Sequence, residues 1–188
     1  MYLRPILLLC GVLFIQGCAV AVVAGTASAV SAANDRRTIG SQIDDNSIEI
    51  KATLALKQIP RLAKHANINV VSVNGTVLLT GQVANEEMRT EANSAVTNVM
   101  GVKRLLNQVR IGSNIGLSTQ THDTWLTSKV KTQLLASDNV NGSNIKVITE
   151  NAEVFLMGMV AKDEAEQAVD IARNIHGVER VIKAFEYL

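Results

Sequence analysis

Hydrophobic and polar positions change period along this chain in a fixed order, and the order occurs twice. In the clearer, second occurrence, one segment has apolar side chains at helical spacing, two segments alternate, a fourth is helical again and a fifth alternates. These segments are 123–137, 145–147, 154–160, 163–175 and 178–187. The pattern predicts a helix, two strands, a second helix and a last strand.

The first of these helices has one clear core stripe. It consists of Leu126, Val130, Gln133, Leu134 and Ser137. Asp123 precedes the stripe, and a carboxylate in that place commonly accepts hydrogen bonds from the free N–H groups of a first helical turn. We therefore expect Asp123 to cap this helix and the stripe to face the sheet.

The first occurrence matches the second at a nearly constant offset. Segment 68–83 corresponds to segment 145–160, which lies 77 positions later. The offset is 78 upstream, where Asp45 corresponds to Asp123, and 76 downstream. A drift of one residue places small insertions in the turns, as tandem copies of one domain would have. Each copy is therefore predicted to be an αββαβ unit of the α+β class, with two helices packed on a three-stranded mixed sheet.

The two predicted hairpins differ in their turns. Asn74-Gly75 in the first copy is a strong hairpin signal, because both central residues accept a positive φ. The second copy has Asn151-Ala152, and alanine is less favourable at such a position. The sequence alone therefore leaves the geometry of the second turn undecided.

The amino terminus has the features of a secretory signal. An uncharged apolar stretch begins at Pro5, follows the single cation Arg4, and ends with small Gly17 just before Cys18. The sequence Ile15-Gln16-Gly17-Cys18 is similar to the lipobox of bacterial lipoproteins, whose cysteine is acylated. We therefore predict that Cys18 is lipidated. Because two or more acyl chains anchor a protein stably, this lipidation would hold the protein at a membrane.

Two alternatives concern the same segment. The uncharged run continues through Ala33, which is long enough for a signal anchor, although the residues after Cys18 are small and only weakly hydrophobic. Cys10 is the other candidate for lipidation, but the apolar run before it is short and Leu9 is bulky. With Cys18 as the first residue of the mature protein, the chain divides into a signal peptide, a tether, a first domain, a linker and a second domain. These parts are 1–17, 18–43, 44–111, 112–121 and 122–188.

The composition argues against several function classes. Both cysteines lie in the amino-terminal segment, and the three histidines have no metal-ligand spacing. No glycine-rich phosphate loop or nucleophile elbow occurs. The balance of 18 Lys+Arg against 17 Asp+Glu gives no global field for nucleic acid. We expect no catalysis, no metal, no cofactor and no nucleic-acid partner.

One helix face in the second copy places apolar side chains away from the core. Trp125 lies about 130° from the core stripe, and Leu135 lies farther still, among hydroxyls and cations. The face consists of Trp125, Ser128, Lys129, Lys131, Thr132 and Leu135. An indole there suits a membrane interface, and it suits equally a contact with the first domain, the linker or a partner protein.

The first copy differs on the equivalent face. Ser47 stands where the second copy has Trp125, and Ile50 and Leu54 form a stripe away from the core. We expect Ile50 and Leu54 to pack against a neighbouring segment. A lipid role would therefore belong to the second copy.

These residues carry a resemblance to a known family. The two αββαβ copies, with their V-x-L-x-G-x-V strand, resemble paired BON domains. The lipobox, segment 37–45 and above all segment 123–135 resemble the division- and outer-membrane-stress-associated lipid-binding lipoproteins of Gram-negative bacteria, and the likeness covers essentially the whole chain. Ala152 departs from that family, which tends to carry glycine there.

That resemblance implies a non-enzymatic lipoprotein anchored in the outer membrane, with its domains facing the periplasm. Ala19 after the lipidated cysteine fits this destination. The family further implies binding of anionic phospholipids, namely phosphatidylglycerol and cardiolipin, by the first helix of the second BON domain. It also implies enrichment at the division site, a part in envelope integrity, and links to septal amidase control and the outer-membrane assembly machinery. The alternative is a periplasmic adaptor whose Trp125 face docks a protein.

Overall fold

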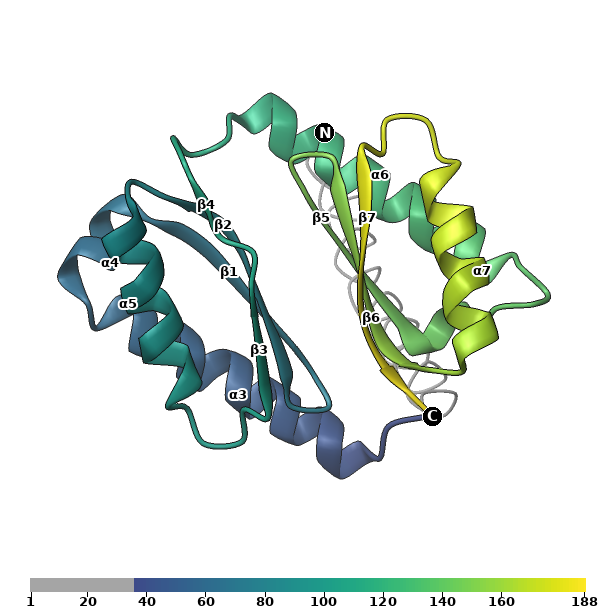
Figure 1. Ribbon diagram of the computed structural model, residues 1–188, viewed down its shortest axis with the longest axis horizontal. Coiled ribbons are helices and arrows are strands. Elements are labelled where there is room, and N and C mark those ends of the chain that lie inside the picture. The colour runs from purple at the N-terminus through teal and green to yellow at the C-terminus, as the bar shows by residue number, and fades with distance from the viewer. Residues whose placement is uncertain (1–35) are drawn as a thin grey trace, which may run out of the picture. The chain divides into compact units, whose positions relative to one another are not determined.

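Two αββαβ modules follow one another along residues 36–188, the part of the chain that the computed structural model describes (Figure 1). The predicted signal peptide 1–17, the lipidation site Cys18 and most of the predicted tether lie outside the described residues. The two modules together form one compact unit, Arg36–Leu188.

The first module is built around strand β2. Its elements are α3 (Ile39–Lys57), α4 (Pro60–His65), β1 (Asn67–Val73), β2 (Thr76–Val83), α5 (Glu86–Thr97), β3 (Arg104–Asn107) and β4 (Arg110–Ile111). Strand β2 pairs antiparallel with β1 and parallel with both β3 and β4. The last strand of the predicted unit is thus present as two short pieces along one edge.

The second module repeats this plan with an uninterrupted last strand. Its elements are α6 (Leu117–Leu135), η1 (Gly142–Asn144), β5 (Ile145–Glu150), β6 (Glu153–Val160), α7 (Lys162–Arg173) and β7 (Arg180–Tyr187). Strand β6 pairs antiparallel with β5 and parallel with β7. The predicted α+β class, with helices on a three-stranded mixed sheet in each module, is confirmed, and the first module has the short helix α4 in addition to the two predicted helices.

The first helix of each module begins earlier than the sequence analysis expected. Helix α3 begins at Ile39, within the predicted tether, and Thr38 caps it by accepting a hydrogen bond from the Ser41 amide at 3.0 Å. Helix α6 begins at Leu117, within the predicted linker, after Gly116, which has no side chain to accept a capping hydrogen bond. Each helix therefore has about one and a half further turns that the stripe alone did not reveal.

Asp123 does not cap α6, so that expectation was wrong. It is buried in the second turn, and its carboxylate accepts hydrogen bonds from the backbone amides of Asn151 at 2.7 Å and Ala152 at 2.9 Å. Asp45 on α3 accepts the equivalent bonds from Asn74 at 2.7 Å and Gly75 at 2.9 Å. In each module, this aspartate ties the first helix to the turn of the hairpin.

The two hairpin turns have the same geometry. Asn74 and Gly75 have φ values of 51° and 78°, and Asn151 and Ala152 have values of 52° and 61°. Ala152 is therefore held in the left-handed region, which costs about 1–2 kcal/mol for a residue with a Cβ. The two bonds to Asp123 hold this turn in place.

Each sheet packs on its own helices through one face. In the second module, this core includes Leu126, Val130 and Leu134 of α6, as predicted, together with Leu156 of β6. Gln133, which the sequence analysis placed in the stripe, is exposed. The first module has an equivalent core between its sheet and the helices α3 and α5.

The opposite faces of the two sheets pack against each other. A third apolar cluster joins side chains of β1 and β2 to side chains of β6 and β7. It contains Val71, Val73, Leu78, Phe155, Met157 and Ala184. The modules are also joined at its margin, where Lys146 Nζ lies 3.0 Å from Glu49 Oε1 and Arg110 lies 2.5 Å from Glu153. The sheets therefore lie between two outer layers of helices (Figure 1).

Candidate functional site

The outward face of α6 exposes three large apolar side chains. Leu117 is 79% exposed, Leu135 is 56% exposed and Trp125 is 48% exposed. Leu126, Val130 and Leu134, which turn toward the sheet, are all fully buried. These exposed side chains therefore belong to the surface of the described unit and not to its core.

Trp125 is held between two side chains of its own helix. The His122 ring stacks on the indole with a centroid separation of 5.8 Å and an angle of 28° between the planes. The Lys129 ammonium lies 4.6 Å from the centroid of the indole ring, within the range of a cation–π contact. These contacts restrict the rotation of the tryptophan while half of its surface stays open to solvent.

The hydroxyl groups of this face are already hydrogen-bonded inside the helix. Each donates to the carbonyl oxygen four residues earlier, over 2.9–3.0 Å. The donors are Thr121, Thr124, Ser128 and Thr132. A hydroxyl whose proton is satisfied within the helix costs less to remove from water than a free one. The polar positions of the face are therefore compatible with an apolar environment.

The structure brings most of the predicted site residues together on this face. Trp125, Ser128, Thr132 and Leu135 are exposed, and Lys129 is half-buried beside the indole. Their role in phospholipid binding stays a prediction. Sequence reasoning missed Leu117, because the helix was expected to begin after the linker.

Lys131 is held in a different environment. Its ammonium donates hydrogen bonds to the carbonyl oxygens of Gly142 at 2.8 Å and Ile145 at 2.6 Å. These bonds fix the segment that leads from η1 into β5. The Lys131 ammonium is thus held at this segment, whereas the Lys129 ammonium lies over the indole. The contact of Lys131 with phospholipid stays a prediction.

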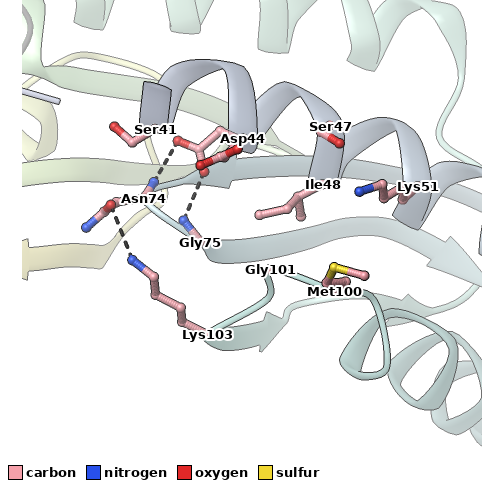
Figure 2. A pocket seen from close by; sticks show the side chains of 11 residues that line it. Ser41, Asp44, Ser47, Ile48, Lys51, Asn74, Gly75, Met100, Gly101 and Lys103 are labelled. Atoms are coloured by element: carbon pink, nitrogen blue, oxygen red, sulfur yellow. Dashed lines mark hydrogen bonds between the residues drawn. The ribbon is translucent and has the colours of Figure 1, made fainter. Parts of the chain in front are cut away.

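The first module has a groove beside α3, at the positions that correspond to His122 and Trp125 of α6. Figure 2 shows Ser41, Asp44, Ser47 and Lys51 of α3 along one side of a cavity of about 290 Å³, opposite the loop that carries Lys103. The smaller side chains of α3 keep this groove open, whereas in the second module the His122 ring fits against Gly177, where an added Cβ would lie 3.3 Å from Nε2. The two modules have thus diverged in shape as well as in polarity.

Ile50 and Leu54 were expected to pack against a neighbouring segment, but within residues 36–188 no segment covers them. Ile50 is 61% exposed and Leu54 is 54% exposed. They belong to a longer exposed stripe on α3, which also includes Ile39 and Ile43.

Two kinds of feature are absent from residues 36–188. No helix of this unit combines the length and apolarity needed to cross a bilayer. No cluster of three or more histidine, cysteine, aspartate or glutamate side chains in the same residues has an arrangement that could hold a metal ion.

Comparison with known proteins identifies the family. The model of the BON domain matches residues 44–113 and again residues 122–188. The chain is 40% identical over 182 residues to the outer membrane lipoprotein DolP of Haemophilus influenzae, a match that covers 97% of this chain and 94% of that protein. It is 38% identical to the 21 kDa hemolysin of Actinobacillus pleuropneumoniae, over 82% of this chain and 79% of that one.

A more distant relative matches over a smaller part of the chain. The chain is 30% identical to the osmotically-inducible protein Y of Escherichia coli, over 76% of this chain and 72% of that protein. The predicted lipoprotein character, outer-membrane location and lack of enzymatic activity agree with the close similarity to DolP over nearly the whole chain. The chain therefore belongs to the BON-domain family, as a non-enzymatic outer-membrane lipoprotein with two BON domains.

Proposed function

We propose that this lipoprotein binds anionic phospholipids, such as phosphatidylglycerol and cardiolipin, through the outward face of α6. The face consists of Leu117, Trp125, Ser128, Lys129, Thr132 and Leu135, with the Lys131 charge nearby. An acylated Cys18 holds the protein in the outer membrane, with both domains on the periplasmic side. In this arrangement, α6 is the second contact with the same bilayer.

The stack of His122, Trp125 and Lys129 is the observation that carries this proposal. It presents an indole with a cation on its own helix, which matches the apolar and anionic parts of a lipid interface. Burial of a large apolar side chain contributes about 1.5–3 kcal/mol, and a lysine near an anionic surface adds about 1 kcal/mol. Leu117 and Leu135, at the two ends of the helix, extend the apolar contact.

Attraction between α6 and lipid has to be local. Residues 119–188 contain seven Lys+Arg and ten Asp+Glu, so the second module as a whole is repelled by an anionic bilayer. The isolated contact is therefore weak. The acyl anchor raises the effective concentration of α6 at the bilayer, so that a weak contact is formed for much of the time.

The chain that arrives from the anchor is fixed to the second module. Arg36 donates a hydrogen bond from its guanidinium to Glu164 Oε2 at 2.6 Å, and its backbone amide donates to Asn144 Oδ1 at 3.1 Å. The carboxyl end of the tether is thus attached to the module that carries Trp125. This attachment supports a role for the second module in contacting the membrane.

A role in envelope integrity at the division site follows from the resemblance to the division-associated lipoproteins. The competing proposal is an adaptor that docks a protein of the assembly machinery, or a regulator of septal amidases, on the same face. Exposed apolar side chains fit both occupants. Binding to pure lipid separates the two.

The experiment is co-sedimentation of the compact unit 36–188 with phosphatidylglycerol vesicles. Trp125→Glu replaces the indole with a charge, and we expect vesicle binding to fall about tenfold or more, since about 1.4 kcal/mol already gives that factor. Because Trp125 is half-exposed, the melting temperature should change little.

Two variants serve as controls. Ser47→Glu alters the equivalent position of α3 and should leave lipid binding unchanged. Val130→Glu places a charge at a fully buried position and should unfold the module. A folded Trp125→Glu protein that binds vesicles as tightly as the parent would reject the lipid proposal and favour the adaptor.

A further inference from the structure

The outward face of α3 carries an apolar stripe that no described residue covers. Ile39, Ile43, Ile50 and Leu54 are between 54% and 71% exposed. At about 100° per residue, they fall within a sector of about 60°, nearly opposite the buried stripe of the same helix. Four large aliphatic side chains on one helix face mark a contact site more often than an ordinary surface.

The spacing of this stripe is symmetric. Ile39 and Leu54 are equally far from the midpoint between Asn46 and Ser47, and so are Ile43 and Ile50. If a second α3 lies antiparallel to the first, a twofold axis at this midpoint places Ile39 against Leu54 and Ile43 against Ile50. The surface is therefore complementary to itself, which is the requirement for a twofold contact.

Charges on one flank of the stripe are complementary in the same arrangement. Asp44 and Lys51 are exposed on the same side of α3, about 90–110° from the centre of the stripe, where flanking residues of paired helices meet. Neither has a salt-bridge partner within residues 36–188. The antiparallel pair brings Asp44 of each copy close to Lys51 of the other.

Asn46 lies at the mid-length of the exposed stripe, about 50° to one side of its centre line. Ile39, Ile43, Asn46 and Ile50 follow the alternating spacing of four, three and four that is typical of paired helices. A single polar residue at a central position of such a seam fixes the register of the pair at some cost in stability. The antiparallel arrangement brings the two Asn46 side chains near each other.

We infer that α3 is a self-association surface, which pairs with α3 of a second copy of this chain around a twofold axis near Asn46. A contact between two single helices buries less surface than the lower limit of stable interfaces, which is about 1,200 Å². The pair therefore forms weakly in dilute solution. Confinement of both copies to one membrane raises their effective concentration. The α6 face stays outside this contact, so pairing presents two copies of it.

Oxidative cross-linking of the full-length lipoprotein in its membrane tests the inference. Asn46→Cys places a thiol next to the proposed axis, and an oxidant should join two copies through a disulfide. Thr124→Cys, the equivalent position on α6, is the matched control and should yield little dimer. Ile50→Glu, added to Asn46→Cys, should lower the dimer yield about tenfold without lowering the melting temperature, because Ile50 is exposed.

Charge exchange gives a test of the twofold arrangement itself. In the Asn46→Cys background, Asp44→Lys and Lys51→Asp should each lower the yield when present alone. When both variants are produced together, the yield should return as mixed dimers. In these dimers a copy with lysine at positions 44 and 51 pairs with a copy that has aspartate at both positions. Random collision would give equal dimer yields from positions 46 and 124 and would overturn the inference.

Two other occupants of the stripe would also overturn it. If lipid covers the stripe, Ile50→Glu should reduce vesicle binding, and mixing the charge variants should restore nothing. If residues 18–35 of the same copy cover it, Asn46→Cys should give no dimer at all, whichever charge variants are combined.

Discussion

Helices α3 and α6 occupy equivalent places in the two modules, and they agree on one face and differ on the other. Ile48, Ala52 and Leu56 of α3 are buried against the sheet, as are Leu126 and Val130 of α6. Their aspartates both bind the hairpin turn. The inward face is thus determined by the shared fold.

The outward faces have diverged at most corresponding positions, although Ile39 and Leu117 keep an exposed aliphatic side chain at the start of each helix. Where α3 has the aliphatic residues Ile43, Ile50 and Leu54, α6 has hydroxyl residues, and where α3 has Ser47, α6 has Trp125. The first face is a mainly aliphatic stripe with Asn46 at its mid-length, and the second carries an indole and two leucines among internally bonded hydroxyls and a cation. The comparison teaches that a duplicated domain can keep one core and acquire two separate contact surfaces.

The largest expected effect is on stability and concerns Asp45 and Asp123, which occupy corresponding positions of α3 and α6. Asp45 also accepts hydrogen bonds from the Ser72 hydroxyl at 2.7 Å and the Arg37 guanidinium at 2.9 Å, whereas within residues 36–188 Asp123 accepts bonds only from the two turn amides. Asp45→Ala should therefore lower the free energy of unfolding by about 3–4 kcal/mol, and Asp123→Ala by about 2 kcal/mol. Urea denaturation measures both. Equal losses would show that the extra bonds of Asp45 contribute nothing.

Acid should weaken the first module through the same residue. Burial alone would raise the pKa of Asp45, but hydrogen bonds from Gly75, Ser72, Asn74 and Arg37 outweigh it and hold the pKa below the usual 3.8. Its contribution is complete above the unfolded pKa and is lost as the pH falls through the lower folded value. Stability should drop below about pH 4 in the parent and less so in Asp45→Asn, as followed by denaturation at pH 7, 4 and 3. Parallel curves for the two proteins would contradict this prediction.

A smaller effect is expected from the hairpin turns. Ala152→Gly removes the strain of a positive φ and should raise the free energy of unfolding by about 1 kcal/mol. The reciprocal change, Gly75→Ala, should lower it by more, because its Cβ would lie 2.9 Å from the Gly101 carbonyl oxygen at a φ of +78°. Thermal denaturation of the two variants checks the pair. A loss of stability in Ala152→Gly would show that the second turn is not strained.

The strands and the inward helix faces were predictable because their periods are local. Alternation located β5 and β6, and the stripe of Leu126, Val130 and Leu134 located the buried face of α6. Asp123 was misread because an aspartate ahead of a helical stripe has the same pattern whether it caps the helix or lies inside it. Only a contact with a turn 28 residues away distinguishes the two roles.

The contact between the two sheets was not predicted, although the sequence contained a signal for it. Leu78 and Phe155 occupy positions that simple alternation assigns to the solvent-facing side of their strands, and both are buried. Apolar residues at every position indicate a strand covered on both faces. The exposure of Ile50 and Leu54 could not be predicted in this way, because apolar periodicity does not reveal whether a partner is present.

The central claim is that α6, and not α3, binds lipid. An NMR titration of residues 36–188 with phosphatidylglycerol bicelles tests it residue by residue. We expect the largest shifts at Leu117, Trp125, Ser128 and Leu135, with little change at Ser47 and Lys51 of α3. Shifts that are equal on both helices, or that are largest on α3, would contradict the account.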